Sequence, residues 1–97
     1  SVRTHALATL GVSALLLFTH APAIWWAVMA ITIGLVVATE LLNTAIEALA
    51  DHLHPQQHAA IKLTKDVAAG AVLVASLMAM VVAAVFFLDQ VWPLLSA

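Results

Sequence analysis

Three stretches of the sequence are almost free of charge, and they constrain the fold more than any other feature. Residues 23–39 and 67–88 contain no Asp, Glu, Lys or Arg, and residues 6–18 are apolar apart from Thr9 and Ser13. A helix needs about 20 apolar residues to cross the hydrocarbon core of a bilayer. The sequence therefore predicts three membrane-spanning helices, at about residues 2–20, 23–49 and 60–92.

The composition supports a membrane protein and excludes other classes. Of the 97 residues, 65% are hydrophobic and 8% are charged, whereas about a quarter are charged in a typical soluble domain. A chain this small cannot bury so much apolar surface by itself, so lipid or a partner chain must cover it. A net charge of -2 gives no basic face for nucleic acid, and the absence of cysteine excludes thiol chemistry. We expect one all-α membrane domain over residues 1–97.

The positions of the three cations predict the orientation. Arg3 precedes the first span, and Lys62 and Lys65 lie between the second and third spans. Since Lys and Arg are enriched in cytoplasmic segments, both regions should face the cytoplasm, including a loop at about residues 51–58. The turn at residues 19–22 and the C-terminus should then lie on the opposite side.

Polar residues at the end of the second span share one helix face. Glu40, Asn43, Glu47 and Asp51 follow at offsets of 3, 4 and 4, which places them within an arc of roughly 80° on a helix with about 100° per residue. For Asp51 alone, a solvated helix end explains the acid equally well. Glu40 directly follows the apolar run, and an ionisable group at membrane depth is a functional candidate by default.

Charged residues of both signs also begin the third span, on the same predicted side. For Lys62, we favour a cation that extends to the membrane surface. Lys65 is followed by Asp66 and then by apolar residues, so it lies where the helix enters the membrane. Carboxylates that hold Mg²⁺, a lysine that meets phosphate and a buried acid that accepts a hydroxyl proton are the parts of phosphoryl transfer. The sequence has no glycine-rich phosphate loop, so a nucleotide site must be of another kind.

Together these motifs resemble a known family. ELLNTAIEALAD at residues 40–51 is followed by His58 and by KDVAAGAVL at residues 65–73, with the Lys-Asp pair 25 residues after the first Glu. This pattern, with three spans, resembles the prokaryotic diacylglycerol kinases, a family that includes undecaprenol kinases. The resemblance implies ATP-dependent, Mg²⁺-requiring transfer of a phosphoryl group to a lipid alcohol, diacylglycerol or undecaprenol. It also implies a homotrimer in the bacterial inner membrane, with cytoplasmic sites shared between subunits.

The resemblance also implies roles for individual residues. Glu40 would be the general base, and Glu47 would be a metal ligand. The remaining residues would bind ATP, either through phosphate, metal or ribose or by lining its site: Asn43, Asp51, Gln56, Gln57, His58, Lys65 and Asp66. The deepest acid would thus meet the lipid hydroxyl, and the acids nearer water would meet the hydrated metal and nucleotide.

At the N-terminus the sequence departs from the family pattern. The family has an F-R-x-[EH] element, which appears here as Val2-Arg3-Thr4-His5. An amphipathic segment with an acid, upstream of Ser1, would complete the implied metal site. His5 in place of Glu and the KDVAAGAVL segment are more similar to the undecaprenol kinase branch.

A second hypothesis needs no nucleotide. The chain would then be a non-catalytic membrane protein, either a cation-binding or transport subunit or a packing partner whose acids hold an ion. Mg²⁺-dependent protection of the protein by an ATP analogue would argue against it. Cation flux in vesicles without ATP would favour it.

Overall fold

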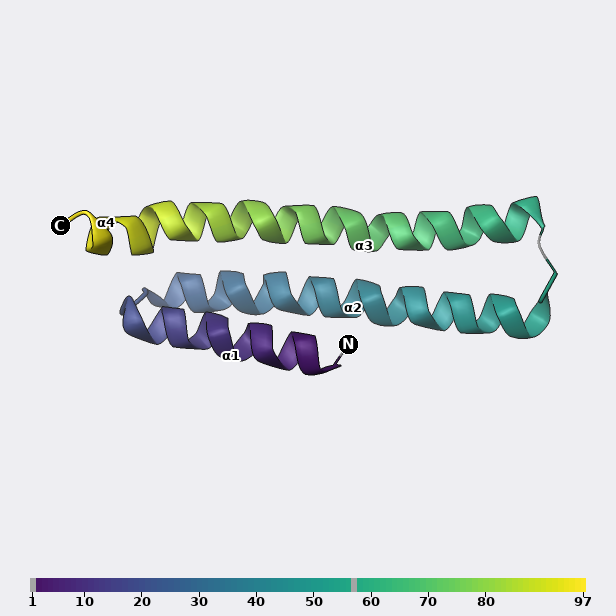
Figure 1. The fold of residues 1–97 in the computed structure, drawn as a ribbon, viewed down its shortest axis with the longest axis horizontal. Coiled ribbons are helices and arrows are strands. Elements are labelled where there is room, and N and C mark those ends of the chain that lie inside the picture. The colour runs from purple at the N-terminus through teal and green to yellow at the C-terminus, as the bar shows by residue number, and fades with distance from the viewer. Residues whose placement is uncertain (1, 57) are drawn as a thin grey trace.

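The computed structural model describes residues 2–56 and 58–97, and these residues form helices without any strand. The expected all-α fold is therefore confirmed. Consecutive long helices run antiparallel in a rod of 59 × 20 × 19 Å (Figure 1). The elements are α1 (Val2–Phe18), α2 (Ala23–Leu53), α3 (Ala59–Phe86), the π-helical turn η1 (Phe87–Val91) and α4 (Trp92–Leu95).

Two helical segments of the described chain are long and apolar enough to cross a membrane. They are Ala23–Leu53 and Ala59–Leu95, and few of their residues are buried within the chain. Helix α1 has 17 residues and is about 26 Å long, slightly less than the roughly 30 Å of a bilayer core. The structure thus supports a membrane protein with two candidate spans. The third span, over α1, stays a prediction.

Helix α1 ends in a Schellman turn, which reverses the chain toward α2. The N–H of Ala21 donates to the carbonyl of Leu16 at 3.0 Å, and the N–H of His20 donates to Leu17 at 3.2 Å. His20 has a φ of 51°, the left-handed conformation that this motif requires. Ala21 packs against the cluster that contains Leu16, the apolar contact that commonly accompanies the motif. Pro22 then precedes the first residue of α2.

The loop between α2 and α3 is shorter than the predicted loop at residues 51–58. Helix α2 continues through Leu53, so Asp51 lies in its last helical turn. The helix stops at His54 because Pro55 follows, and a residue before proline disfavours the helical conformation. His58 begins α3 as its N-cap, with its Nδ1 accepting a hydrogen bond from the N–H of Ala60 at 3.1 Å. Because Asp51 lies within α2, the helix fixes its position relative to the rest of the acidic face.

The two ends of the rod differ in chemistry. The turn after α1 and the C-terminus lie at one end, the loop between α2 and α3 lies at the other, and the first turn of α1 lies midway along α2 (Figure 1). At the C-terminal end, Leu16, Met29 and Phe86 join the three long helices in a buried apolar cluster. The rings of Trp25 and Phe86 meet edge-on, with their centroids 5.1 Å apart. The Nε1–H of Trp25 donates a hydrogen bond to Oδ2 of Asp89 at 3.0 Å. Apolar packing thus holds the end that is remote from the polar loop.

Replacing Phe86 with Ala is expected to destabilise the fold more than the same change at Phe87. Phe86 is 4% exposed, whereas its neighbour Phe87 is 42% exposed. We expect a cost of about 1–3 kcal/mol for Phe86→Ala, below the roughly 3–5 kcal/mol of soluble cores because lipid solvates the apolar ring in the unfolded state. Unfolding in detergent, followed by circular dichroism, measures the difference. Equal midpoints for the two variants would contradict the packing described here.

Candidate functional site

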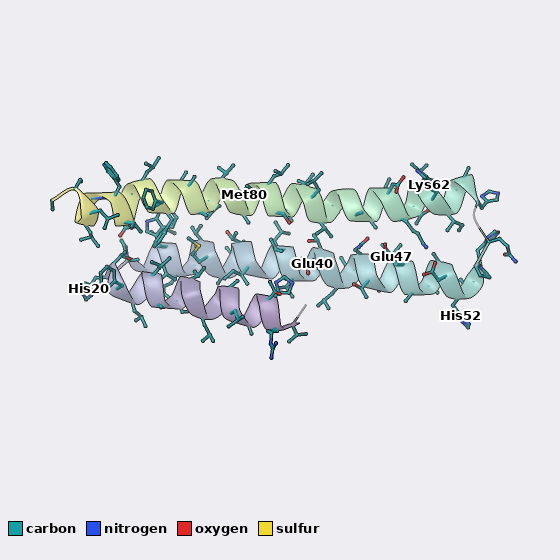
Figure 2. All side chains as sticks on the ribbon, in the orientation of Figure 1. His20, Glu40, Glu47, His52, Lys62 and Met80 are labelled. Carbon is teal, nitrogen blue, oxygen red and sulfur yellow. The ribbon has the colours of Figure 1, made fainter. Side chains whose placement is uncertain are left out.

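The polar face predicted for α2 contacts α1 at its first acid and α3 at its last. Its first acid, Glu40, contacts His5 of α1, and its last acid, Asp51, contacts Lys65 of α3. Figure 2 shows Glu40 near the middle of α2 and Glu47 closer to the loop. At about 1.5 Å per residue, the 31 residues of α2 extend about 46 Å, which is longer than the roughly 30 Å of a bilayer core. The face therefore extends from the middle of α2 at Glu40 to its last turn at Asp51.

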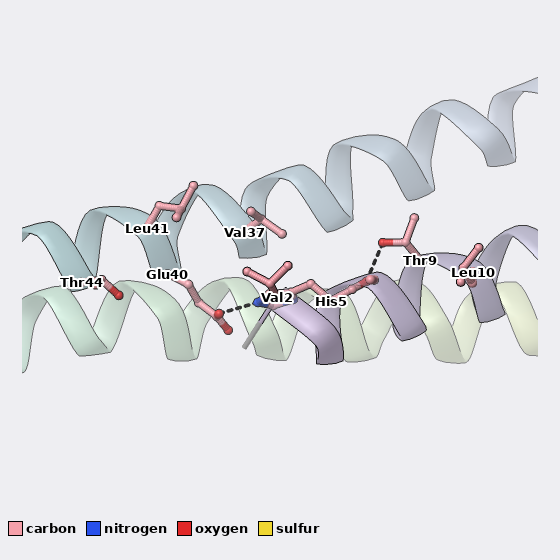
Figure 3. A pocket seen from close by; sticks show the side chains of 9 residues that line it. Val2, His5, Thr9, Leu10, Val37, Glu40, Leu41 and Thr44 are labelled. Atoms are coloured by element: carbon pink, nitrogen blue, oxygen red, sulfur yellow. Dashed lines mark hydrogen bonds and ion pairs between the residues drawn. The ribbon is translucent and has the colours of Figure 1, made fainter.

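Glu40 faces a largely apolar cavity between α1 and α2. The cavity has a volume of about 670 Å³ and is lined by Val2, His5, Ala6, Thr9, Leu10, Val37, Glu40, Leu41 and Thr44. His5 Nε2 lies 2.5 Å from Glu40 Oε2, and the two side chains are 28% and 37% exposed (Figure 3). An ionised carboxylate in such surroundings needs a hydrogen-bond partner, and His5 provides one.

A second, smaller cavity lies at the loop and brings together most of the residues that the resemblance assigns to ATP. It has a volume of about 110 Å³, and its lining is mainly polar: Asp51, His54, Pro55, Gln56, His58, Ile61, Lys62, Lys65 and Asp66. Lys65 Nζ donates to Asp51 Oδ1 at 2.5 Å and joins α3 to α2. Lys62 instead donates to Asp66 on its own helix, at 3.1 Å. The predicted site residue Gln57 lies outside the described residues.

Asn43 and Glu47 lie between the two cavities and line neither of them. The Oδ1 atom of Asn43 is buried without a hydrogen-bond partner, and Glu47 is exposed. They are four positions apart, so their side chains are neighbours on one helix face. Their oxygen atoms suit Mg²⁺, which protein sites bind through one or two carboxylates while it keeps water and substrate phosphates. Residues 2–56 and 58–97 contain no cluster of three His, Cys, Asp or Glu residues that would form a complete metal cage.

A single chain does not bring all of these residues to one point. Glu40 and Asp51 are eleven positions apart, or about 16 Å along α2, with Glu47 between them. Helix α1 begins beside Glu40, so it does not cover the later acids (Figures 1 and 3). The predicted residues of α2 therefore form a row along this helix, with an apolar cavity at the first acid and a polar cavity at the last.

His5 is a site residue that we did not predict from the sequence. In the family resemblance, His5 appears only as part of the Val2-Arg3-Thr4-His5 element and has no assigned role. That element was the available signal, since it places a titratable side chain in the first helical turn of α1. The contact with Glu40 depends on how α1 and α2 pack against each other, and neither helix alone shows it.

The model of the family described as prokaryotic diacylglycerol kinase matches residues 1–87. The chain is 41% identical to a diacylglycerol kinase of Synechocystis sp. over 95 residues, which cover 97% of this chain and 53% of that protein. It is 37% identical to the undecaprenol kinase of Bacillus subtilis over 65 residues, which cover 67% of this chain and 53% of that protein. The chain thus spans about half the length of these relatives. No solved structure matches.

Proposed function

The chain belongs to the prokaryotic diacylglycerol kinase family, and we propose that its protein is an ATP- and Mg²⁺-dependent kinase that phosphorylates a membrane lipid alcohol. The observation that carries this proposal is the row of polar residues along α2. It begins at Glu40 beside an apolar cavity and ends at Asp51 beside a polar one. A reaction between a lipid and a nucleotide needs such a connection between apolar and polar surroundings.

In this proposal Glu40 is the general base at the lipid end. Its carboxylate takes the proton of the lipid hydroxyl while the alcohol oxygen bonds to the γ-phosphorus of ATP. The bond between that phosphorus and the bridging oxygen breaks, and ADP leaves with the electron pair. The apolar lining of the Glu40 cavity suits a lipid chain better than water, and water would otherwise compete with the alcohol as nucleophile.

Asn43 and Glu47 would hold the magnesium ion between the two ends of the row. The unpartnered Oδ1 of Asn43 and the exposed carboxylate of Glu47 support this assignment. Mg²⁺ would neutralise charge on the triphosphate. Because these residues offer few ligands, the ion would be bound together with the nucleotide.

The cavity at the loop would bind the rest of ATP. Lys65 is well placed to turn from Asp51 toward a phosphate, and the side chains of Gln56, His58 and Asp66 line the same cavity. A phosphate competes well for an ammonium group because it offers several strong acceptor oxygens.

We further propose a homotrimer in a bacterial inner membrane, with the site on the cytoplasmic side. Lys62 and Lys65, at the loop end, support that orientation. The uncovered part of the polar face leaves room for a neighbouring subunit. Large apolar side chains of α2 near the loop are also exposed, and a neighbour would cover them: Leu41, Leu42, Leu49 and Leu53. The names of the two relatives give diacylglycerol and undecaprenol as the candidate substrates.

Phosphoryl transfer in mixed micelles tests this function. The full-length protein is incubated with Mg²⁺, ATP labelled at the γ-phosphate and either diacylglycerol or undecaprenol. We expect label in the lipid extract with at least one of the two alcohols. No labelled lipid, under conditions in which the Bacillus subtilis undecaprenol kinase is active, would reject the proposal. Cation flux in vesicles without ATP would then favour a cation-transport subunit.

Lys65→Met is expected to weaken the use of ATP more than Lys62→Met. Lys65 is 33% exposed and reaches across to α2, whereas Lys62 is 71% exposed and pairs within α3. Loss of one cationic donor near the phosphates should lower kcat/KM for ATP by about 10- to 100-fold. The matched change at Lys62 should lower kcat/KM for ATP by no more than about 3-fold. Steady-state kinetics at saturating lipid measure both. Equal losses would show that Lys65 has no special role.

A further inference from the structure

The contact between His5 and Glu40 suggests a residue role that the family resemblance did not supply. These two residues are 35 positions apart and belong to different helices, yet His5 Nε2 lies 2.5 Å from Glu40 Oε2. Within residues 2–56 and 58–97, this is the contact between two ionisable side chains that joins α1 to α2. The first turn of α1 is thereby connected to the acid at the start of the polar row.

The surroundings of the pair favour a specific and persistent hydrogen bond. Both side chains are only partly exposed, and the other residues that line their cavity carry no charge. The hydrogen bond is therefore stronger than it would be in water, and no charged side chain of the lining competes for the carboxylate. With one oxygen of Glu40 bound to His5, the other is left to accept a proton.

We propose that His5 is the positioning residue of Glu40. Its Nε2–H donates to Oε2 of the carboxylate and fixes the orientation in which the remaining oxygen meets the lipid hydroxyl. This inference rests on the proposed kinase function, since it concerns the step in which Glu40 accepts the hydroxyl proton. His5 itself touches neither the phosphate nor the alcohol, so it acts through the geometry of Glu40.

A pair of amide substitutions separates this role from a general effect on folding. His5→Gln carries an N–H donor at about the reach of Nε2, whereas His5→Asn has the same amide on a side chain one methylene shorter. A misplacement of a catalytic group by about 1 Å can cost 10²-fold in rate. We therefore expect His5→Asn to lower kcat by about 10- to 100-fold and His5→Gln by less than about 5-fold, with KM for ATP changed less than about 2-fold in both.

The assay uses the full-length protein, with His52→Gln as the control for loss of an exposed histidine on α2. That control should keep its rate within about 2-fold, and size-exclusion chromatography in detergent should show the same elution for all variants. An active parent with a fully active His5→Asn variant would overturn the positioning role, and so would equal losses in the Asn and Gln variants. An inactive parent protein would instead reject the proposed kinase function.

If His5→Asn fails to fold, a spectroscopic readout still tests the contact. The imidazole ¹⁵N signals of His5 are compared in the parent protein and in Glu40→Gln by NMR. A shift of the Nε2 signal, with the other histidine signals unchanged, is expected when the carboxylate is removed. Identical His5 signals in the two proteins would overturn the proposal.

Discussion

Glu40→Gln is expected to lower the kcat of lipid phosphorylation by about 10²–10⁴-fold, the contribution typical of a general base. The amide is nearly isosteric with the carboxylate and can still bond to His5, so the fold should persist. It cannot accept the hydroxyl proton, so only the chemical step is lost. Transfer of labelled phosphate to lipid measures the change, and size-exclusion chromatography checks that the assembly is intact.

Asp89→Asn is the matched control for this experiment, because Asp89 is a carboxylate near the C-terminal end of the rod, away from Glu40, and accepts a hydrogen bond from Trp25. It should keep the rate within about 2-fold. A Glu40→Gln protein with near-normal turnover would rule out Glu40 as the base. A comparable loss in Asp89→Asn would show that removing any acid impairs the protein.

Glu47→Gln is expected to lower activity by more than about 100-fold at a Mg²⁺ concentration that saturates the parent protein. Changes to groups that only support a metal ligand already cost about 10–100-fold, so the loss of a direct ligand should cost more. Excess Mg²⁺ should restore part of the rate, since Asn43 Oδ1 and the ATP phosphates still offer ligands. Activity measured against Mg²⁺ concentration tests this directly.

Glu47→Asp is the informative control, because it keeps the charge on a side chain one methylene shorter. Its Mg²⁺ dependence should lie between those of the parent and Glu47→Gln. If all three proteins show the same Mg²⁺ dependence, the assignment of Glu47 to the metal is wrong.

Periodicity within one helix was enough to predict the polar face of α2. A helix places residues three and four apart on one side, so the spacing from Glu40 to Asp51 alone predicts their common direction. Helix α3 begins after the cap residue His58, which follows a proline-containing loop.

Contacts between helices could not be predicted in the same way. The pairing of Glu40 with His5 depends on the offset between α1 and α2, which the Schellman turn at His20 helps to set. The loop began later than predicted because Asp51 and His52 continue α2, and polarity alone does not end a helix. Glu40 lines one cavity because α1 begins beside it, and Asp51 lines the other because the loop joins α2 and α3 there; no local motif indicates this arrangement.

The central claim is that ATP binds at the loop end of α2 and α3, so that phosphoryl transfer occurs along the row that starts at Glu40. Photolabelling of the full-length protein with 8-azido-ATP, followed by mass spectrometry of its peptides, tests this claim most directly. We predict Mg²⁺-dependent label within residues 51–66 that excess ATP prevents. Label that ATP displaces only from residues 19–26 or 87–97, at the opposite end of the rod, would contradict it.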